Sequence, residues 1–446
     1  MGGLAMINER EYLAQVLKAA PRQFANILRT AGGDAERILR LHFGDALFER
    51  MQNLGRNMAA TPPGTVVLLP GVLGSELYEN AEHVWISIWN IIRGDVYQLP
   101  LDANGRSLKA IQPSTPLKDY YGEMQLALLQ QWNVVTFAYD WRLDIRALAR
   151  QLKEKIDTSV PAASGFSLVA HSLGGLIGRS YLQQFPEDLK RLQKFIMLGT
   201  PNYGTLAAPV LFNGLNDVFK IVALLDQQHY LPDLLQVAKT WVSTYQMLPF
   251  PGKSADAARL MDPAVYGDLN PPPQRFDAAR AFQQEINGTD TTRMTYIAGY
   301  GFKTPDYISD WSKLKSWDGY HQTLAGDGLV PHSLGLLDKV PTYFVQAEHN
   351  SLPANTRVIQ AVIDILATGA SALPRQMPQI DILTQRMMAA EKLTECTARE
   401  TRAHMLREIV RMELLAHPDK LSVSETELRN LIFNGTRHTA WVAAGN

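Results

Sequence analysis

The chain has 446 residues, of which 46% are hydrophobic and 20% are charged, and its formal net charge is −1. This balance is typical of a globular protein with a large buried core, and it excludes a disordered chain and a fibrous repeat. A nearly neutral charge also argues against a general nucleic-acid-binding protein, so we expect no nucleic acid among its partners.

The first residues and the cysteine content point to a cellular location. Charged residues at positions 9–11 stand where a signal peptide would carry its apolar core, and no uninterrupted apolar run reaches about 18 residues. The single cysteine, Cys396, excludes an intrachain disulfide framework and a cysteine-based zinc cluster. We therefore expect a cytoplasmic protein whose contact with membranes, if any, is peripheral.

Helical periodicity fills the start of the chain. Apolar residues recur at helical spacing over residues 1–60, and Pro21 and Gly32-Gly33 divide this extension into about three short helices. The segment 61–64, Thr-Pro-Pro-Gly, then reads as a linker to the next domain.

The region 61–372 alternates between short β-branched runs and helical segments. The expected strands are Thr65–Leu69, Val134–Tyr139, Phe166–Val169, Phe195–Leu198, Met294–Ala298 and Thr342–Val345. The expected helices among them include Leu143–Ile156, Leu173–Phe185 and Thr356–Thr368. This alternation predicts an α/β domain with a mostly parallel sheet covered on both faces. Rossmann-like and hydrolase-like folds both satisfy it, so the site must decide between them.

Two long segments, about 71–131 and 205–292, interrupt the alternation. Insertions of this length are rarely structureless, and we interpret both as cap elements over an active site. The first contains Trp85 and Trp89 in an apolar stretch, and such side chains could dock at a bilayer surface.

A second helical extension follows the hydrolase-like region. Residues 373–446 begin with a proline-containing linker and continue with mostly helical patterns. One interpretation of the two extensions is that they bind a protein partner or mediate self-association.

The clearest chemical motif is Ala170-His171-Ser172-Leu173-Gly174, between a predicted strand and a predicted helix. This context is that of a nucleophile elbow, in which a sharp turn presents the serine above the sheet. Small neighbours are needed there, and Ala170 stands where glycine is usual. The motif makes Ser172 the candidate nucleophile, with His171 interpreted as a packing residue.

A serine nucleophile needs a base and an acid that orients the base, in the chain order serine, acid, histidine. Asp327 lies between two glycines after the 294–298 strand, and His349 follows the last strand. His332 and Asp338 are the rival candidates: His332 lies very near Asp327 in sequence, and Asp338 is the weaker acid candidate.

An acyl-transfer site also needs two backbone N–H donors for the oxyanion. One is expected from Leu173, directly after the serine, and the other from the loop after the first strand. In that loop Gly71 allows a close approach of the backbone, and Val72 is the predicted donor; a plain glycine turn is the alternative interpretation.

Several segments together resemble the lecithin:cholesterol acyltransferase family of α/β-hydrolases, with its phospholipid:diacylglycerol acyltransferase and lysosomal phospholipase A2 relatives. The matching segments, in order, lie at residues 69–77, 139–142, 170–175, 198–205, 245–249, 326–331 and 348–349. The Tyr-Asp-Trp-Arg segment at 139–142 and the Pro-Gly-Val-Leu-Gly-Ser segment at 70–75 are much more specific than the elbow alone. The resemblance spans about residues 64–368 and leaves both helical extensions uncovered.

The resemblance implies an α/β-hydrolase fold with Ser172 as nucleophile, Asp327 as acid and His349 as base. It places Val72 and Leu173 at the oxyanion hole, and Trp85 and Trp89 in the region that contacts membrane and guards the site. The disulfide-bonded loop of the family is absent there, because the only cysteine is Cys396.

The expected activity is that of a serine-dependent lipid acyl-ester hydrolase or O-acyltransferase. Phospholipid-like substrates are implied by the resemblance, and no metal or organic cofactor is expected for this chemistry. The alternatives are an esterase of soluble non-lipid esters and a catalytically silent scaffold with a hydrolase fold.

Overall fold

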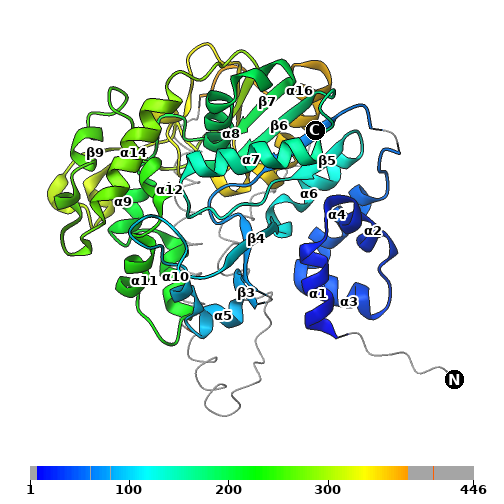
Figure 1. Ribbon diagram of the computed structural model, residues 1–446, viewed down its shortest axis with the longest axis horizontal. Coiled ribbons are helices and arrows are strands. Elements are labelled where there is room, and N and C mark those ends of the chain that lie inside the picture. The colour runs from blue at the N-terminus through cyan, green and yellow to red at the C-terminus, as the bar shows by residue number, and fades with distance from the viewer. Residues whose placement is uncertain (1–7, 61, 81, 380–404, 406–446) are drawn as a thin grey trace.

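The protein is built around a parallel β-sheet (Figure 1). The computed structural model describes residues 8–60, 62–80, 82–379 and 405. Within them, six strands pair in the order β11-β8-β7-β6-β1-β5, and every pairing is parallel. The strands are β1 Thr65–Leu69, β5 Asn133–Thr136, β6 Phe166–His171, β7 Leu192–Leu198, β8 Met294–Gly299 and β11 Thr342–Val345. The predicted α/β class with a mostly parallel sheet is thus confirmed.

The strands form where short β-branched and aromatic runs are buried on both faces. All six residues of β6 and of β8 are buried, which is why these segments show continuous apolar character instead of alternation. The expected strand Val134–Tyr139 is too long at its C-terminal end. β5 ends at Thr136. Phe137 N–H still donates to Leu68 O at 3.0 Å, and beyond it the Tyr139 hydroxyl donates to the carbonyl of Pro70 at 2.5 Å.

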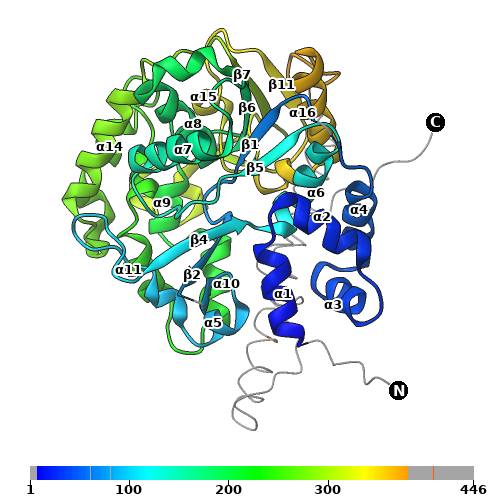
Figure 2. The ribbon, with the colours of Figure 1, turned by 45° about the vertical axis from the view of Figure 1, so that its right-hand side comes forward.

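Helices cover the sheet and connect its strands (Figures 1 and 2). Those that flank it include α6 Lys118–Leu129, α7 Ile145–Ser159, α8 Leu173–Gln184 and α16 Thr356–Thr368. Short 3₁₀ segments, η2 Pro186–Lys190 and η6 His349–Ala354, precede β7 and α16. Asn355 caps α16 by accepting the N–H groups of Arg357 and Val358, and the αL residue Gly369 ends that helix.

The N-terminal extension forms a group of helices beside α6, drawn in dark blue in Figures 1 and 2. It contains four helices where the sequence predicts about three: α1 Glu9–Lys18, α2 Pro21–Thr30, α3 Asp34–Phe43 and α4 Asp45–Gly55. The additional break lies at Gly44, whose φ of 76° separates α3 from α4. Phe24, Leu28, Phe48 and Met51 are fully buried in the same core that includes the sheet.

The first insertion forms a small sheet and short helices. The sheet has the order β3-β2-β4, with β2 Ser75–Glu79, β3 Glu82–Trp85 and β4 Ile111–Pro116; α5 Ile88–Ile92 and η1 Asp95–Gln98 follow β3. Helix α6 lies within the range 71–131 that we expected to form a cap. It packs instead against β5 and η6, so it belongs to the layer that flanks the main sheet.

The second insertion is mostly helical. Its elements are α9 Ala207–Phe212, α10 Asp217–Leu225, α11 Leu231–Ala238, α12 Val242–Gln246, α13 Ala257–Leu260, η3 Pro263–Leu269 and α14 Pro273–Ile286. The remaining elements lie between β8 and β11: β9 Thr304–Ile308, η4 Trp311–Lys313, η5 Trp317–Gly319, β10 Tyr320–Thr323 and α15 His332–Gly335. β9 and β10 form an antiparallel pair and are not among the predicted strands.

One segment, Ala207–Leu225, is long and apolar enough to cross a membrane by length and composition. It is divided into α9 and α10, and 61% of it is buried inside the protein. Its apolar side chains therefore contribute to the core of the second insertion. Of the predicted C-terminal extension 373–446, all but residues 373–379 and Met405 lies outside the described residues, and so does Cys396.

Candidate active site

The candidate nucleophile lies at the turn between β6 and α8. Ser172 has φ 52° and ψ −122°, a conformation that L-residues rarely adopt, and its N–H donates to Leu198 O at 2.9 Å. The turn requires small neighbours: a Cβ on Gly175 would lie 1.9 Å from Thr200 Oγ1. The backbone strain and close packing are those of a nucleophile elbow.

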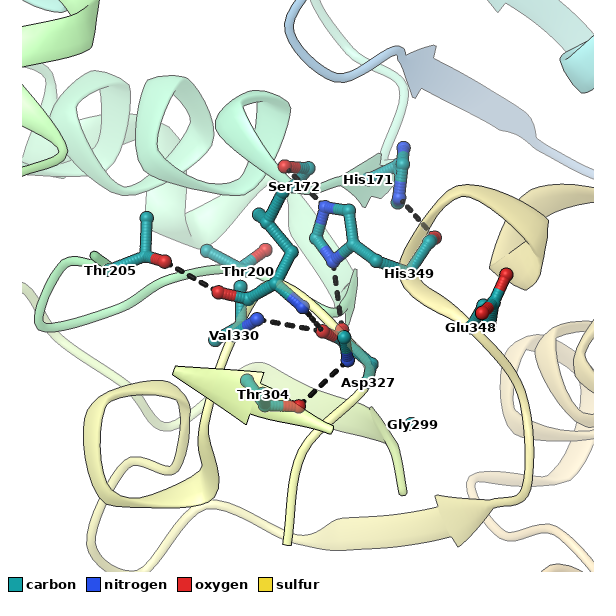
Figure 3. A network of polar contacts seen from close by, with 12 residues as sticks. His171, Ser172, Thr200, Thr205, Gly299, Thr304, Asp327, Val330, Glu348 and His349 are labelled. Carbon is teal, nitrogen blue, oxygen red and sulfur yellow. Dashed lines mark hydrogen bonds and ion pairs between the residues drawn. The ribbon is translucent and has the colours of Figure 1, made fainter. Parts of the chain in front are cut away.

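The structure brings the three residues predicted for the triad into one hydrogen-bonded line (Figure 3). His349 Nε2 lies 2.8 Å from Ser172 Oγ, and His349 Nδ1 lies 2.8 Å from Asp327 Oδ2. An ionised carboxylate only accepts hydrogen bonds, so Nδ1–H donates to Asp327 and Nε2 is left to accept from the serine hydroxyl. Ser172, Asp327 and His349 are 1%, 2% and 5% exposed, so this line is shielded from bulk water.

Asp327 is held in place by its own loop. Its Oδ1 accepts the N–H groups of Leu329 at 3.0 Å and Val330 at 2.7 Å, and its carbonyl accepts the N–H of His349 at 2.8 Å. Figure 3 shows Val330 beside this carboxylate, and near it Thr304, whose Oγ1 accepts the N–H of Gly328 at 2.8 Å. The second carboxylate oxygen is thereby aimed at the imidazole of His349.

The rival candidates lie elsewhere. His332 Nε2 donates to the carbonyl of Gly299 at 2.8 Å, and burial lowers the pKa of this imidazole. Asp338 is exposed, and the structure gives it no hydrogen bond or ion pair within the described residues. Neither residue is bonded to Ser172 or His349.

The loop after β1 carries the predicted oxyanion donor. Gly71 packs closely on the elbow, since a Cβ there would lie 3.0 Å from both Ser172 Cβ and His171 Nδ1. The Gly71 N–H donates to the hydroxyl of Tyr121 at 2.8 Å, whereas Val72 N–H has no acceptor within the described part of the chain. Leu173 begins α8, so its N–H has no partner inside the helix. Both predicted donors, Val72 and Leu173, thus keep an amide available for a ligand.

The Tyr-Asp-Trp-Arg segment holds the loops around the site. Tyr139 anchors Pro70, the residue before Gly71. Asp140 receives two hydrogen bonds from the buried guanidinium of Arg142, at 2.8 and 2.6 Å. Arg142 also donates to Leu99 O and to a serine hydroxyl at position 107, which ties the first insertion to the body.

Of the two tryptophans predicted for the lid, only Trp85 has a side chain that the structure describes. Trp85 is 2% exposed, donates its indole N–H to Leu73 O at 2.9 Å and packs edge-on against Trp141. Its ring is thus part of the interior, which contradicts the expectation that Trp85 contacts a membrane in this conformation. Trp89 belongs to α5, but its side chain lies outside what the structure describes.

His171 does more than the packing that the sequence predicts for it. Both of its ring nitrogens are hydrogen-bonded, one to the Tyr121 hydroxyl and the other to the backbone carbonyl of His349.

No group of three or more potential metal ligands occurs among the residues that the structure describes.

A parallel sheet with a serine at the turn after β6, followed along the chain by Asp327 and His349, defines the class of α/β-hydrolases. A model of the lecithin:cholesterol acyltransferase family matches residues 126–358, more than half of the chain. The chain belongs to this family, which confirms the resemblance.

The chain is also similar, at low sequence identity, to individual proteins. The uncharacterized protein YJR098C of Saccharomyces cerevisiae is 28% identical over 156 residues, which cover 31% of this chain and only 23% of the yeast protein. A chain in the crystal structure of the Tle4-Tli4 complex is 12% identical in sequence to this protein. The match covers 67% of this chain and 97% of that chain, with a TM-score of 0.46. The phospholipase PlaB from Legionella pneumophila is 12% identical, covers 68% of this chain and 57% of that chain, and has a TM-score of 0.33.

Proposed function

We propose that this protein is a serine-dependent lipid acyl-ester hydrolase or O-acyltransferase that acts through an acyl-enzyme on phospholipid-like substrates. The observation that carries this proposal is the buried line from Ser172 Oγ through His349 to Asp327, with both separations at 2.8 Å. Family membership supports a lipid substrate, because the family is named for the transfer of an acyl group from lecithin, a phospholipid.

The proposed first half-reaction forms the acyl-enzyme. His349 Nε2 takes the proton of Ser172 as Oγ attacks the ester carbonyl carbon, and the carbonyl oxygen becomes an oxyanion that accepts from the amides of Val72 and Leu173. The imidazolium is stabilised by the Asp327 carboxylate. It then protonates the leaving alcohol or lysolipid as the carbon–oxygen bond breaks.

The second half-reaction reverses these roles. Water or an acceptor alcohol gives its proton to His349 and attacks the acyl carbon, and Ser172 leaves with the proton returned by the imidazolium. Transfer to an alcohol exceeds hydrolysis only if the site excludes water and binds the alcohol. The burial of the triad is compatible with transfer.

The test uses a fluorophosphonate probe and a phospholipid substrate with the full chain. The wild type should be labelled covalently and should release fatty acid or a transferred acyl ester, detected by mass spectrometry. Ser172→Ala should lose labelling and lower kcat by at least about 10⁴-fold, because the nucleophile is removed. Ser351→Ala is the matched control, since that hydroxyl donates to Glu348 O and not to the triad. Labelling of Ser172→Ala at the wild-type rate would refute the assignment.

The same experiment separates the alternatives. A soluble-ester esterase would turn over short-chain esters and leave phospholipid vesicles intact. A silent scaffold would neither be labelled nor turn over any ester.

A further inference from the structure

A chain of hydrogen bonds runs from the loop after β1 to the backbone of the candidate base. Gly71 N–H lies 2.8 Å from Tyr121 Oη, which lies 2.9 Å from His171 Nδ1. His171 Nε2 in turn lies 3.0 Å from the carbonyl oxygen of His349. The chain thus joins four segments, because Tyr121 belongs to α6, His171 to β6 and His349 to η6.

Every proton in this chain has a defined direction. The carbonyl of His349 can only accept, so His171 Nε2 carries a hydrogen and donates it. Burial, and then the neighbouring His349, lower the pKa of His171 well below its ordinary value, so the ring is neutral and Nδ1 accepts. The Tyr121 hydroxyl therefore donates to Nδ1 and accepts from Gly71 N–H. Burial raises the pKa of Tyr121, which keeps this hydroxyl protonated.

The chain of hydrogen bonds ends at the loop that carries the predicted oxyanion donor on one side and at the backbone of the candidate base, His349, on the other. At one end, Tyr121 binds the amide of Gly71, and the next amide along the loop is that of Val72. At the other end, His171 binds the backbone of His349, whose imidazole contacts Ser172 Oγ. Tyr121 and His171 are 3% and 5% exposed, so water does not compete for these bonds.

We propose that Tyr121 and His171 are positioning residues that fix the Val72 amide relative to the imidazole of His349. This inference rests on the proposed function, because it concerns the geometry of the same acyl-transfer site. Neither residue touches the reacting atoms. They act by keeping the Val72 amide and the His349 imidazole at a fixed relative position through one chain of hydrogen bonds. A displacement of either group by about 1 Å is enough to slow the reaction on the order of 100-fold.

The first test compares Tyr121→Phe with Tyr181→Phe. Each change removes one buried hydroxyl, and Tyr181 donates to Asp188 at 2.5 Å, outside the chain of bonds described above. Tyr121→Phe should lower kcat about ten- to a hundredfold and slow fluorophosphonate labelling to a similar degree, with KM changed less than about threefold. Tyr181→Phe should leave kcat within about twofold of the wild type.

The second test is a double-mutant cycle with His171→Leu. If Tyr121 and His171 work as one support, either change breaks it, and the double variant should be slower than the slower single variant by less than about threefold. Independent structural roles would instead multiply the two losses. All rates are divided by the folded fraction, measured by near-UV circular dichroism.

Two results would overturn the proposal with the enzyme still active. One is a kcat for Tyr121→Phe equal to that of Tyr181→Phe, and the other is full multiplication of the losses in the double variant. A wild type that is neither labelled nor active on any ester would refute the proposed function itself, and with it this inference.

Discussion

The hydrogen bonds of Asp327 orient its carboxylate toward His349. Two backbone amides occupy Oδ1, so Oδ2 is directed to His349 Nδ1 at 2.8 Å and fixes the tautomer whose Nε2 can accept the serine proton. An amide in its place could present an N–H to the imidazole and favour the wrong tautomer.

We expect Asp327→Asn to lower kcat by about 10⁴-fold with little loss of folding, since the side chain keeps its shape. The measurement is steady-state ester hydrolysis by the full chain. Asp338→Asn, at the exposed rival position, serves as control and should behave like the wild type. A larger loss in the control than in Asp327→Asn would reverse the assignment of the acid.

Gly175 is a second position where one residue decides local structure. Gly175 lies in the first turn of α8, and a methyl group there would lie 1.9 Å from Thr200 Oγ1, just beyond the end of β7 at Leu198. Overpacking of this kind costs about 1–3 kcal/mol.

Gly175→Ala should therefore reduce the free energy of unfolding by about 1–3 kcal/mol in urea titrations. Gly175→Ala combined with Thr200→Ala should recover part of the loss, because the second change removes the clashing hydroxyl. Equal stability of the wild type and Gly175→Ala would show that the elbow tolerates a methyl group.

At the scale of elements, α6 connects the N-terminal helices to the site. One part of it faces those helices: Lys118 Nζ donates to Ala19 O at 2.8 Å and to Gln125 Oε1 at 3.1 Å, and lies 5.0 Å from the centre of the Phe24 ring. Three residues further along, Tyr121 bonds to the loop and to His171. The helix therefore joins the packing of the extension to the geometry of the site.

Lys118 also makes stability depend on pH. Burial lowers its pKa to about 7, and the Glu76 carboxylate counters this only in part. An unfolded lysine stays protonated up to about pH 10, so between these values the unfolded chain binds more protons and the contribution of Lys118 to stability rises with pH.

We predict that the free energy of unfolding attributable to Lys118 rises by about 2 kcal/mol from pH 7 to pH 9. Lys118→Met should remove this rise, whereas Lys190→Met, at an exposed position, should keep it. Urea titrations at both pH values provide the measurement. Parallel behaviour of the wild type and Lys118→Met would disprove the prediction.

At the scale of the whole molecule, the described N-terminal helices belong to the body of the protein. Thr115 Oγ1 donates to Leu17 O at 2.7 Å, Gln130 Nε2 to Leu54 O at 3.1 Å, and Arg50 pairs with Glu123 at 2.7 Å. These bonds surround a fully buried apolar contact that includes Phe24 and Met51. The residues at the junction are thus core residues and not an exposed docking face.

Deletion of residues 1–60 should therefore aggregate the protein or lower its Tm by more than about 10 °C, because it exposes the apolar face of α6 and leaves the buried Lys118 without its carbonyl partner. Thermal unfolding and light scattering measure both effects. Deletion of residues 380–446 is the comparison. A stable, monomeric and fully active 61–446 chain would instead support a separate accessory module.

The sequence by itself determined the α/β class, the family, and the limits of elements with strong local patterns. β1 and α16 begin and end as predicted. The limits of β1 follow from a continuous apolar run, and those of α16 from Asn355 before it and Gly369 after it, so both are visible in consecutive residues. Ser172, Asp327 and His349 were also identifiable, since each follows a strand in a recognisable turn; their catalytic roles stay a prediction.

Only the tertiary structure decided which residues from distant parts of the chain contact those turns. Tyr121 and His171 lie 50 residues apart, and His171 and His349 lie 178 apart, so no local pattern marks their hydrogen bonds. The same holds for Trp85: its place in an apolar stretch predicts contact with a membrane, but its ring packs against Trp141 inside the protein. The physical reason is that periodicity and turn chemistry depend on neighbours in the chain, whereas burial and the partner of a polar group depend on which elements pack together.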